Sequence, residues 1–267
     1  MTPQYWEAFT DLFEGIRLVD LWARIGWADV KRRYRRTVFG PFWSSFSLAV
    51  FVCTMGLVFA TLWKIDPKEY LPYLASGMMT WVLLTSFLTE GCTVFIAAEG
   101  LIKQQRINHT MLLCAMVWRN LITFAHNLAV YIPIYIYGGL PLTANVLLVV
   151  PGIFFLCLNG LWIALVLGML CARYRDIQQV VATLIQISMF VTPIFWSPAQ
   201  LAEHSRVQFL FVDYNMLYHY VEIVRSPLLG QLPSANSWLM VVLATILGWA
   251  LAIFLFSRFR RRIAYWL

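Results

Sequence analysis

The amino-acid sequence predicts an all-α integral membrane protein in which six transmembrane helices follow an N-terminal amphipathic helix. Composition is the first reason, because 61% of the 267 residues are hydrophobic and only 12% are charged. Soluble domains carry roughly 25% charged residues. Uncharged runs are the second reason, since several approach the roughly 20 residues that a helix needs to cross a bilayer. A chain with this much apolar surface requires lipid as its solvent.

Residues 1–41 form the first predicted element, an amphipathic and basic segment at the cytoplasmic surface. Apolar residues recur at helical spacing from Tyr5 to Val19, and polar residues such as Asp11 fall between them. This pattern is typical of a helix that lies in the plane of the membrane interface. A basic cluster at 31–36 follows, and we expect it to contact lipid headgroups before the chain turns into the bilayer.

Six stretches that carry few or no charges predict the transmembrane spans: 42–63, 71–95, 112–138, 142–171, 177–197 and 237–257. Charges interrupt every longer apolar run in residues 198–236, so we predict no seventh span there. We therefore expect a single transmembrane domain over residues 1–267.

The distribution of Lys and Arg predicts the orientation. Fifteen of the 20 lie in the segments that this span count places on one side of the membrane, and four lie on the other side. Because positively charged flanks stay in the cytoplasm, both termini are predicted to be cytoplasmic, in a bacterial inner (plasma) membrane. The net charge of +7 is then a topology signal and an attraction to anionic lipid. It gives no reason to expect a nucleic-acid partner.

Two connecting segments stand out. Residues 98–108, between the second and third spans, are short and polar with an apolar pair at Leu101 and Ile102, which suits a helix that docks onto a partner. An ordinary solvated loop explains the same residues. Residues 198–236 are the longest loop, and loops of that length usually carry function. An apolar helical face from Leu217 to Leu228 predicts a half-buried helix there, with a functional role or that of a structural lid.

Polar and aromatic side chains in the spans are candidates for a translocation path. The span at 177–197 has a polar face, and aromatic side chains can stack on sugar rings, although anchoring at the interface or core packing explains single aromatics equally well. The candidate path residues are Trp43, Phe46, Tyr73, Trp81, Gln179, Thr183, Gln186 and Phe190.

Several kinds of chemistry are missing from the sequence. It has no Gly-Lys pair and so no phosphate-binding loop, which means that another subunit would have to bind any ATP. The histidines do not have the spacing of a zinc site, and no Gly-x-Ser-x-Gly turn is present. We therefore predict no enzymatic activity, no metal and no cofactor in this chain. Only His126 lies deep in a span, while Glu90 and Arg119 could pair across neighbouring helices near the cytoplasmic boundary.

Four short motifs, in this order, resemble a known family. They are Arg-Tyr-Arg-Arg-Thr-Val-Phe-Gly-Pro-Phe-Trp at 33–43, Tyr-Arg-Asp-Ile at 174–177, Thr-Pro-Ile-Phe-Trp at 192–196, and a stretch at 214–230. Met216 and Phe39 depart from the proline and leucine that are usual at these places. With six spans around them, the motifs resemble the permease subunits of ABC-2 type polysaccharide exporters, which move O-antigen, capsule or teichoic acid precursors.

The resemblance implies a channel between two copies of this chain, a homodimer, with a dimer of nucleotide-binding ATPase subunits beneath it. Those partners would bind ATP and Mg²⁺. They would push on residues 98–108 as a coupling helix, through Glu99, Gly100, Leu101, Ile102, Lys103, Gln104 and Arg106.

The implied cargo is a glycan linked to polyprenyl diphosphate, with O-antigen as the first choice. Its diphosphate would be attracted to the basic cluster of Lys31, Arg32, Arg33, Arg35 and Arg36, although plain membrane anchoring explains these residues equally well. The segment at 198–236 would be a periplasmic gate that includes Tyr218, Glu222 and Arg225.

Four alternatives remain at this point. The first is an ABC-2 exporter of capsule or teichoic acid, and the second is an ABC-2 exporter of a drug or small lipid. The third is an ion-coupled secondary carrier that depends on His126, which the scarcity of buried ionisable groups disfavours. The fourth is a membrane enzyme of lipid-linked sugar metabolism, which should have clustered carboxylates or histidines at one membrane face.

Overall fold

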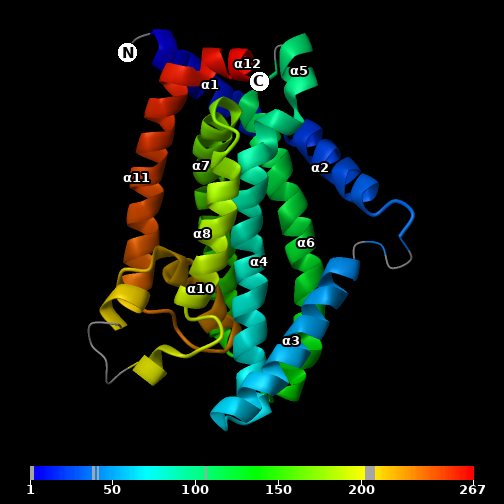
Figure 1. Cartoon of the computed structure of the whole chain (residues 1–267), viewed down its shortest axis with the longest axis vertical. Coiled ribbons are helices and arrows are strands. Elements are labelled where there is room, and N and C mark those ends of the chain that lie inside the picture. Colours follow the sequence, from blue (N-terminus) through cyan, green and yellow to red (C-terminus); the bar gives the residue numbers. More distant parts are fainter. Residues whose placement is uncertain (1–2, 38–39, 41, 106, 202–207) are drawn as a thin grey trace.

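The computed structural model describes residues 3–37, 40, 42–105, 107–201 and 208–267, and all regular secondary structure in these ranges is helical. Figure 1 shows a bundle of long helices with both chain termini at the same end. The short helix α5 lies at that end, and α10 lies at the opposite end. We call them the α5 end and the α10 end.

Six helices run along the bundle, at the positions of the six predicted spans. They are α3 (Phe42–Trp63), α4 (Pro67–Ala97), α6 (His109–Tyr137), α7 (Val149–Arg173), α8 (Ile177–Val191) and α11 (Ala235–Phe259). Helix α4 is central, because it packs against α3, α6, α7, α8 and α10 (Figure 1).

Within the described residues, four helical segments are long and apolar enough to cross a membrane: Phe42–Trp63, Pro67–Ala97, Ala144–Arg173 and Ala235–Trp266. The chain is thus built as a multi-pass membrane protein. Polar residues such as Asn120 and Asn127 make α6 less apolar than these four, and α8 has only 15 residues. The count of six spans therefore stays a prediction.

Helix α8 ends at Val191, six residues before the predicted span end at 197. Thr192 has an extended conformation, with ψ of 136°, because the ring of the following Pro193 disfavours helical backbone at this position. The Thr192-Pro-Ile-Phe-Trp196 motif consequently forms a turn instead of a last helical turn. Its first hydrogen bond runs from the Ile194 amide to the Thr192 carbonyl, 2.7 Å away.

The N-terminal segment forms two helices, α1 (Pro3–Arg17) and α2 (Val19–Arg33). Helix α1 packs against α6 and α11, and α2 packs against α6. Large apolar side chains such as Trp6 and Phe13 remain exposed, as an amphipathic helix requires. The interpretation of Asp11 as a residue of the polar face is wrong, because Asp11 is buried. The position of the N-terminal segment at a membrane surface remains a prediction.

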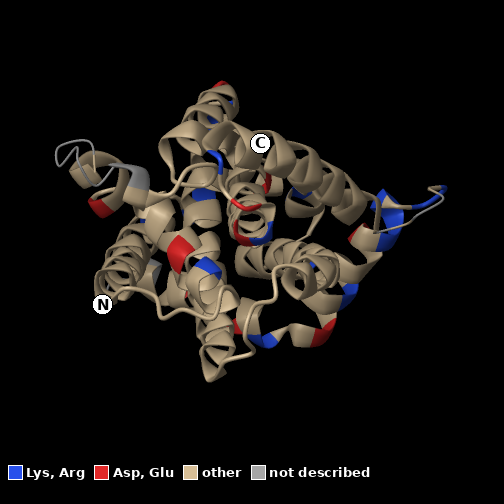
Figure 2. Cartoon of the chain, turned by 90° about the horizontal axis from the view of Figure 1, so that it is seen from below, with Lys and Arg blue, Asp and Glu red and all other residues tan. Residues whose placement is uncertain are grey.

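The C-terminal residues fold back over the α5 end through η4 (Arg260–Arg262) and α12 (Ile263–Trp266) (Figure 1). Helix α12 contacts α5 and α7. Viewed end-on, the ribbon is tan over most of its length, and Lys and Arg gather at the end of α2 (Figure 2).

The α10 end contains η1 (Ala144–Leu148), η2 (Pro198–Leu201), η3 (Phe209–Asp213) and α10 (Met216–Leu228). The segment contains the predicted helix, but this helix is buried and not half-buried as predicted. Helix α10 packs against α4, α7, α11 and η1, and even its His219 and Arg225 side chains are buried. Partners inside the bundle satisfy both side chains. His219 has the Ser237 hydroxyl at 2.9 Å and the Asp213 carbonyl at 3.0 Å.

Candidate functional site

Helix α5 (Glu99–Gln104) stands at the end of α4, inside the segment 98–108 that the sequence singles out. It starts where the Ala98 carbonyl accepts hydrogen bonds from the Leu101 and Ile102 amides. Ile102 is buried, whereas Leu101 is 38% exposed. A hydrogen bond from Lys103, 2.6 Å long, holds the pKa of the Glu99 carboxyl below its usual value. Arg106 lies outside the described residues.

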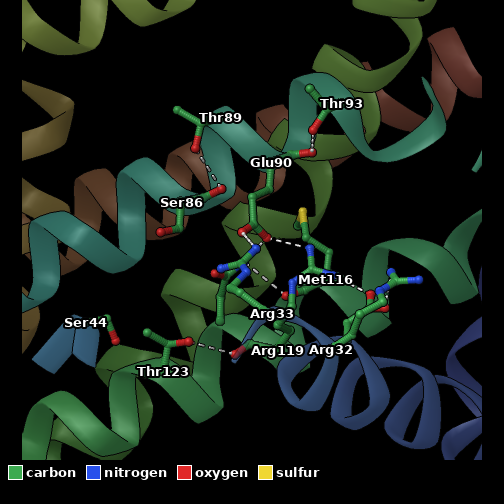
Figure 3. A network of polar contacts seen from close by, with 12 residues as sticks. Arg32, Arg33, Ser44, Ser86, Thr89, Glu90, Thr93, Met116, Arg119 and Thr123 are labelled. Carbon is green, nitrogen blue, oxygen red and sulfur yellow. Dashed lines mark hydrogen bonds and ion pairs between the residues drawn. The ribbon is translucent and has the colours of Figure 1, made fainter. Parts of the chain in front are cut away.

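A network of charges joins α2, α4 and α6 below α5 (Figure 3). The Glu90 carboxylate accepts hydrogen bonds from Arg119 at 2.6 Å, Arg33 at 2.8 Å and Asn120 at 2.9 Å. The Arg119–Glu90 ion pair confirms the pairing that the sequence suggested across neighbouring helices. Arg33 was predicted only as a headgroup contact, and its pairing with Glu90 was missed.

Asp29 completes the network and was also missed. It accepts hydrogen bonds from Arg119 at 2.6 Å and from Arg32 at 2.8 Å. Asp29 and Arg33 are four residues apart on α2 and therefore share a helical face. That spacing was the available signal, but it does not say which helix the face meets.

The network is partly shielded from solvent, with side-chain exposures of 17% for Arg119, 19% for Glu90 and 22% for Asp29. Burial by itself would lower the pKa of Arg33, but the hydrogen bond and charge of Glu90 raise it. Salt screens partly buried pairs less than exposed ones. The network therefore ties α2 to the helices that flank α5.

A cleft of about 670 Å³ opens beside this network, between α2, α4, α5 and α6. Its charged wall consists of Asp29, Arg32, Arg33, Glu90 and Arg119. Its apolar wall includes Ile25, Val94, Leu101, Leu112 and Met116.

The predicted headgroup cluster at 31–36 divides between two environments. Arg32 and Arg33 belong to the charge network, whereas Arg35 and Arg36 are exposed beyond α2. Lys31 lies over the ring of Trp27, with its amine 5.8 Å from the ring centroid.

Asp11 is the centre of a second polar cluster at the α5 end. It accepts hydrogen bonds from the Thr110 hydroxyl at 2.9 Å and from Arg260 at 2.9 Å. Burial alone would raise the pKa of Asp11, but hydrogen bonds from His109 and Thr110 and the charge of Arg260 outweigh it and hold the pKa at about 2. This cluster joins the two ends of the chain, and the sequence did not predict it.

The predicted gate residues at the α10 end do come together. Arg225 is 2% exposed; it donates to the Pro193 carbonyl at 2.6 Å and to Glu222 at 2.9 Å. Its guanidinium lies 4.4 Å from the ring centroid of Tyr73 and 5.7 Å from that of Tyr218. Tyr73, a predicted path residue, therefore packs with the gate residues.

The other predicted path residues fall into separate groups. Trp43 and Phe46 are exposed on α3, with ring centroids 6.0 Å apart. Trp81 is 4% exposed and belongs to the core of the protomer. The α8 candidates are all exposed: Gln179, Thr183, Gln186 and Phe190.

His126 has the environment of a structural residue. Its Nδ1 lies 2.7 Å from the Ile122 carbonyl of its own helix, and its ring packs edge-on against Phe42. The described part of the chain contains no group of three or more His, Cys, Asp or Glu side chains that could hold a metal ion.

A bundle of long apolar helices with charge networks at its ends defines a polytopic helical membrane protein. A family model described as "ABC-2 type transporter" matches residues 21–229, and the chain therefore belongs to that family.

Curated relatives agree with this family. The chain is 24% identical, over 191 residues, to a Klebsiella pneumoniae protein named "O-antigen export system permease protein RfbA"; the match covers 70% of this chain and 72% of the relative. A second Klebsiella pneumoniae protein of the same name is 22% identical over the same shares. A Myxococcus xanthus protein of that name is 20% identical over 178 residues, which are 66% of this chain and 68% of the relative.

Proposed function

We propose that this chain is the channel-forming permease subunit of an ATP-driven exporter that moves lipid-linked polysaccharide from cytoplasm to periplasm. The observation that carries the proposal is family membership together with similarity to O-antigen export permeases over about seven-tenths of the chain. O-antigen is accordingly the first cargo to test, before capsule or teichoic acid.

The proposed partner is a dimer of nucleotide-binding subunits that holds ATP and Mg²⁺ and docks on α5. Helix α5 offers an exposed Leu101 and, beside it, the charged side chains of Glu99 and Lys103. Both termini lie at this end of the bundle (Figure 1). The excess of Lys and Arg in the segments at this end supports a cytoplasmic position in an inner membrane.

A second copy of the chain would cover α8. This helix has no buried residue, and it exposes Gln179, Thr183 and Gln186 together with apolar side chains such as Leu184. Polar side chains that face hydrocarbon are costly, so a polar face in a span belongs against protein or a water-filled path. The exposed face of α8 is therefore the proposed wall between two protomers.

The proposed cargo presents a diphosphate at the membrane surface. The exposed Arg35 and Arg36 beyond α2 offer guanidinium groups, which bind phosphate oxygens through paired hydrogen bonds. A cluster placed where α2 leads toward α3 would attract the lipid end of the glycan before it enters the path.

Purification of this chain from its native membrane tests the proposal. We expect an associated nucleotide-binding subunit and vanadate-sensitive ATP hydrolysis. Leu101→Asp should remove the partner, because it places a charge on the exposed apolar position of α5. Leu232→Asp, at a 68% exposed leucine of the α10 end, is the control and should retain it.

A chain that purifies alone, with export that persists without any ATPase and depends on His126, would overturn the proposal in favour of an ion-coupled carrier. An active complex that exports small lipids but no glycan would correct only the cargo.

A further inference from the structure

The cleft between α2, α4, α5 and α6 has two unlike walls, and the proposed function does not use it. One wall is charged, and the other is built from apolar side chains such as Ile25, Leu112 and Met116. A cavity of about 670 Å³ with this division fits an amphiphile, which is a molecule with one charged end and one hydrocarbon end.

The charged wall favours an anion. Three guanidinium groups, of Arg32, Arg33 and Arg119, face two carboxylates, of Asp29 and Glu90, which leaves one positive charge in excess. A guanidinium has five N–H donors. Asp29 accepts one hydrogen bond from Arg119 and one from Arg32. Glu90 accepts one from Arg119 and one from Arg33. Most donors of this wall are therefore available to a further acceptor.

Arg119 is the most enclosed guanidinium of this wall, with a side chain that is 17% exposed. Its Nε atom is buried and has no hydrogen-bond partner within the described residues. A buried donor without a partner is unusual in proteins, because it has lost its bonds to water without replacement. Glu90 and Asp29 fix the plane of this guanidinium from two sides, 2.6 Å away in both cases.

We infer that this cleft binds the phosphate headgroup of an anionic lipid, with Arg33 and Arg119 as the phosphate donors. The hydrocarbon chain lies along Ile25, Leu112 and Met116. Guanidinium groups match phosphate oxygens in geometry and keep their charge at any physiological pH. This site differs from the exposed Arg35 and Arg36, and it draws on Arg119, which comes from α6.

The site is also connected to α5. Gly100 and Leu101 form part of its lining, so a movement of α5 changes the shape of the cleft. If the partner of the proposed function docks on α5, headgroup binding and ATP hydrolysis are coupled, and coupling between two binding sites is reciprocal. This step, unlike headgroup binding itself, rests on the proposed function.

Two sources carry the same chemistry. One is a phospholipid of the surrounding bilayer, and the other is the diphosphate of a lipid-linked cargo. Native mass spectrometry of the chain purified from its own membrane identifies the lipid that stays bound. A phospholipid retained in cells that make no glycan indicates the first source, and a lipid diphosphate found only in glycan-producing cells indicates the second.

Binding of defined probes tests the site. The probes are dioctanoyl phosphatidylglycerol and farnesyl diphosphate, with dioctanoylglycerol, which lacks phosphate, as the negative control. Arg33→Gln should weaken binding of both phosphate probes about tenfold, because it removes a charge-assisted pair. Arg24→Gln, at an exposed arginine of α2 that does not line the cleft, is the matched control and should leave binding unchanged.

A second variant guards against loss of folding. If Arg33→Gln does not purify as a folded protein, Arg32→Gln at the 81% exposed rim should still weaken binding, by roughly threefold. Equal affinities in the cleft and control variants, or equal binding of dioctanoylglycerol, would overturn the inference. An active exporter whose Arg33→Gln variant binds phosphate probes normally would refute the headgroup site and leave the proposed function standing.

Discussion

Asp11 is enclosed at the α5 end, although its place in an amphipathic helix suggested a solvated residue. Its partners Thr110 and Arg260 are far from it in the sequence. Arg225 is the counterpart at the α10 end, where its partners come from α10 itself and from the turn after α8. At both ends, single charged side chains are buried because several elements supply hydrogen bonds to them at once.

Asp11 predicts a pH dependence of stability. The pKa of Asp11 falls from its usual 3.8 to about 2 in the folded chain. Because the pKa of Asp11 is lower in the folded than in the unfolded chain, ionised Asp11 stabilises the fold by about 2 kcal/mol above pH 4. This contribution is lost as the pH falls toward 2, where Asp11 becomes protonated in the folded chain as well. We expect Asp11→Asn to unfold at lower temperature at pH 7 and to depend less on pH between 4 and 2.

Thermal unfolding of the purified chain in detergent, measured across this pH range, makes the comparison. The charged and titratable groups around Asp11 are Glu7, His109, Arg260 and Arg261. Parallel pH curves for the parent and Asp11→Asn would assign the acid sensitivity to the neighbouring carboxylate of Glu7 instead, because both arginines stay charged throughout this range.

Arg225 predicts a large stability loss on substitution. Arg225→Gln leaves Glu222 without its ion pair and removes the shorter of the two hydrogen bonds to the Pro193 carbonyl, whose other donor is the Tyr73 hydroxyl. Breaking a buried pair by removal of one partner costs about 3 kcal/mol or more. Lys68→Gln, at an exposed charge of the same end, should change the free energy of unfolding by less than about 0.5 kcal/mol.

Unfolding followed by tryptophan fluorescence measures both variants. Arg225→Lys should recover only part of the loss, since an amine cannot reproduce the planar fork of the guanidinium. Arg225→Gln with the stability of the parent would show that the cluster is not a structural clamp.

At the scale of elements, α4 and α7 approach each other closely. A Cβ added at Gly91 would lie 2.8 Å from the Cα of Ala164, and one at Gly160 would lie 2.5 Å from the ring of Phe87. Small residues at helix contacts let backbones approach inside a membrane, where dispersion and not hydrophobic exclusion drives association. The central position of α4 depends on this contact.

Gly91→Ala should therefore destabilise the bundle by about 1–3 kcal/mol, because backbone and not a flexible side chain meets the new methyl group. Gly100→Ala is the control, since nothing lies within 4 Å of a Cβ at that position. As alanine favours helices more than glycine does, Gly100→Ala should leave stability unchanged or slightly raised. Thermal unfolding of the two variants in the same detergent decides the point, and similar losses would contradict the close contact.

At the scale of the whole molecule, the proposed homodimer would cover α8. In a chain whose native cysteines are replaced, Thr183→Cys, at an exposed position of the polar face, should form a disulfide-linked dimer in membranes under mild oxidation. Leu247→Cys on α11, which is also well exposed, is the control and should stay monomeric. Gel electrophoresis without reductant measures the result. Cross-linking through Leu247→Cys alone would assign the interface to α11.

The sequence anticipated the elements of the whole molecule better than their contacts. Residues 42–63 form α3 with the predicted bounds, since apolar length is a local property. The Glu90–Arg119 pair was also anticipated, because both lie near the same membrane boundary on consecutive spans. That Asp29 and Arg33 belong to the same charge network was missed, since helical spacing shows which residues share a face but not which helix that face meets.

By itself, the sequence determined the membrane class, the places of the long helices and the family resemblance, because hydropathy, helical period and short motifs are written in neighbouring residues. Only the tertiary structure decided that Asp11 and Arg225 are buried, that α10 enters the bundle, and that arginines of α2 and α6 share one cleft. The physical reason is that a buried charge depends on partners far along the chain, and only the packing of helices brings those partners together.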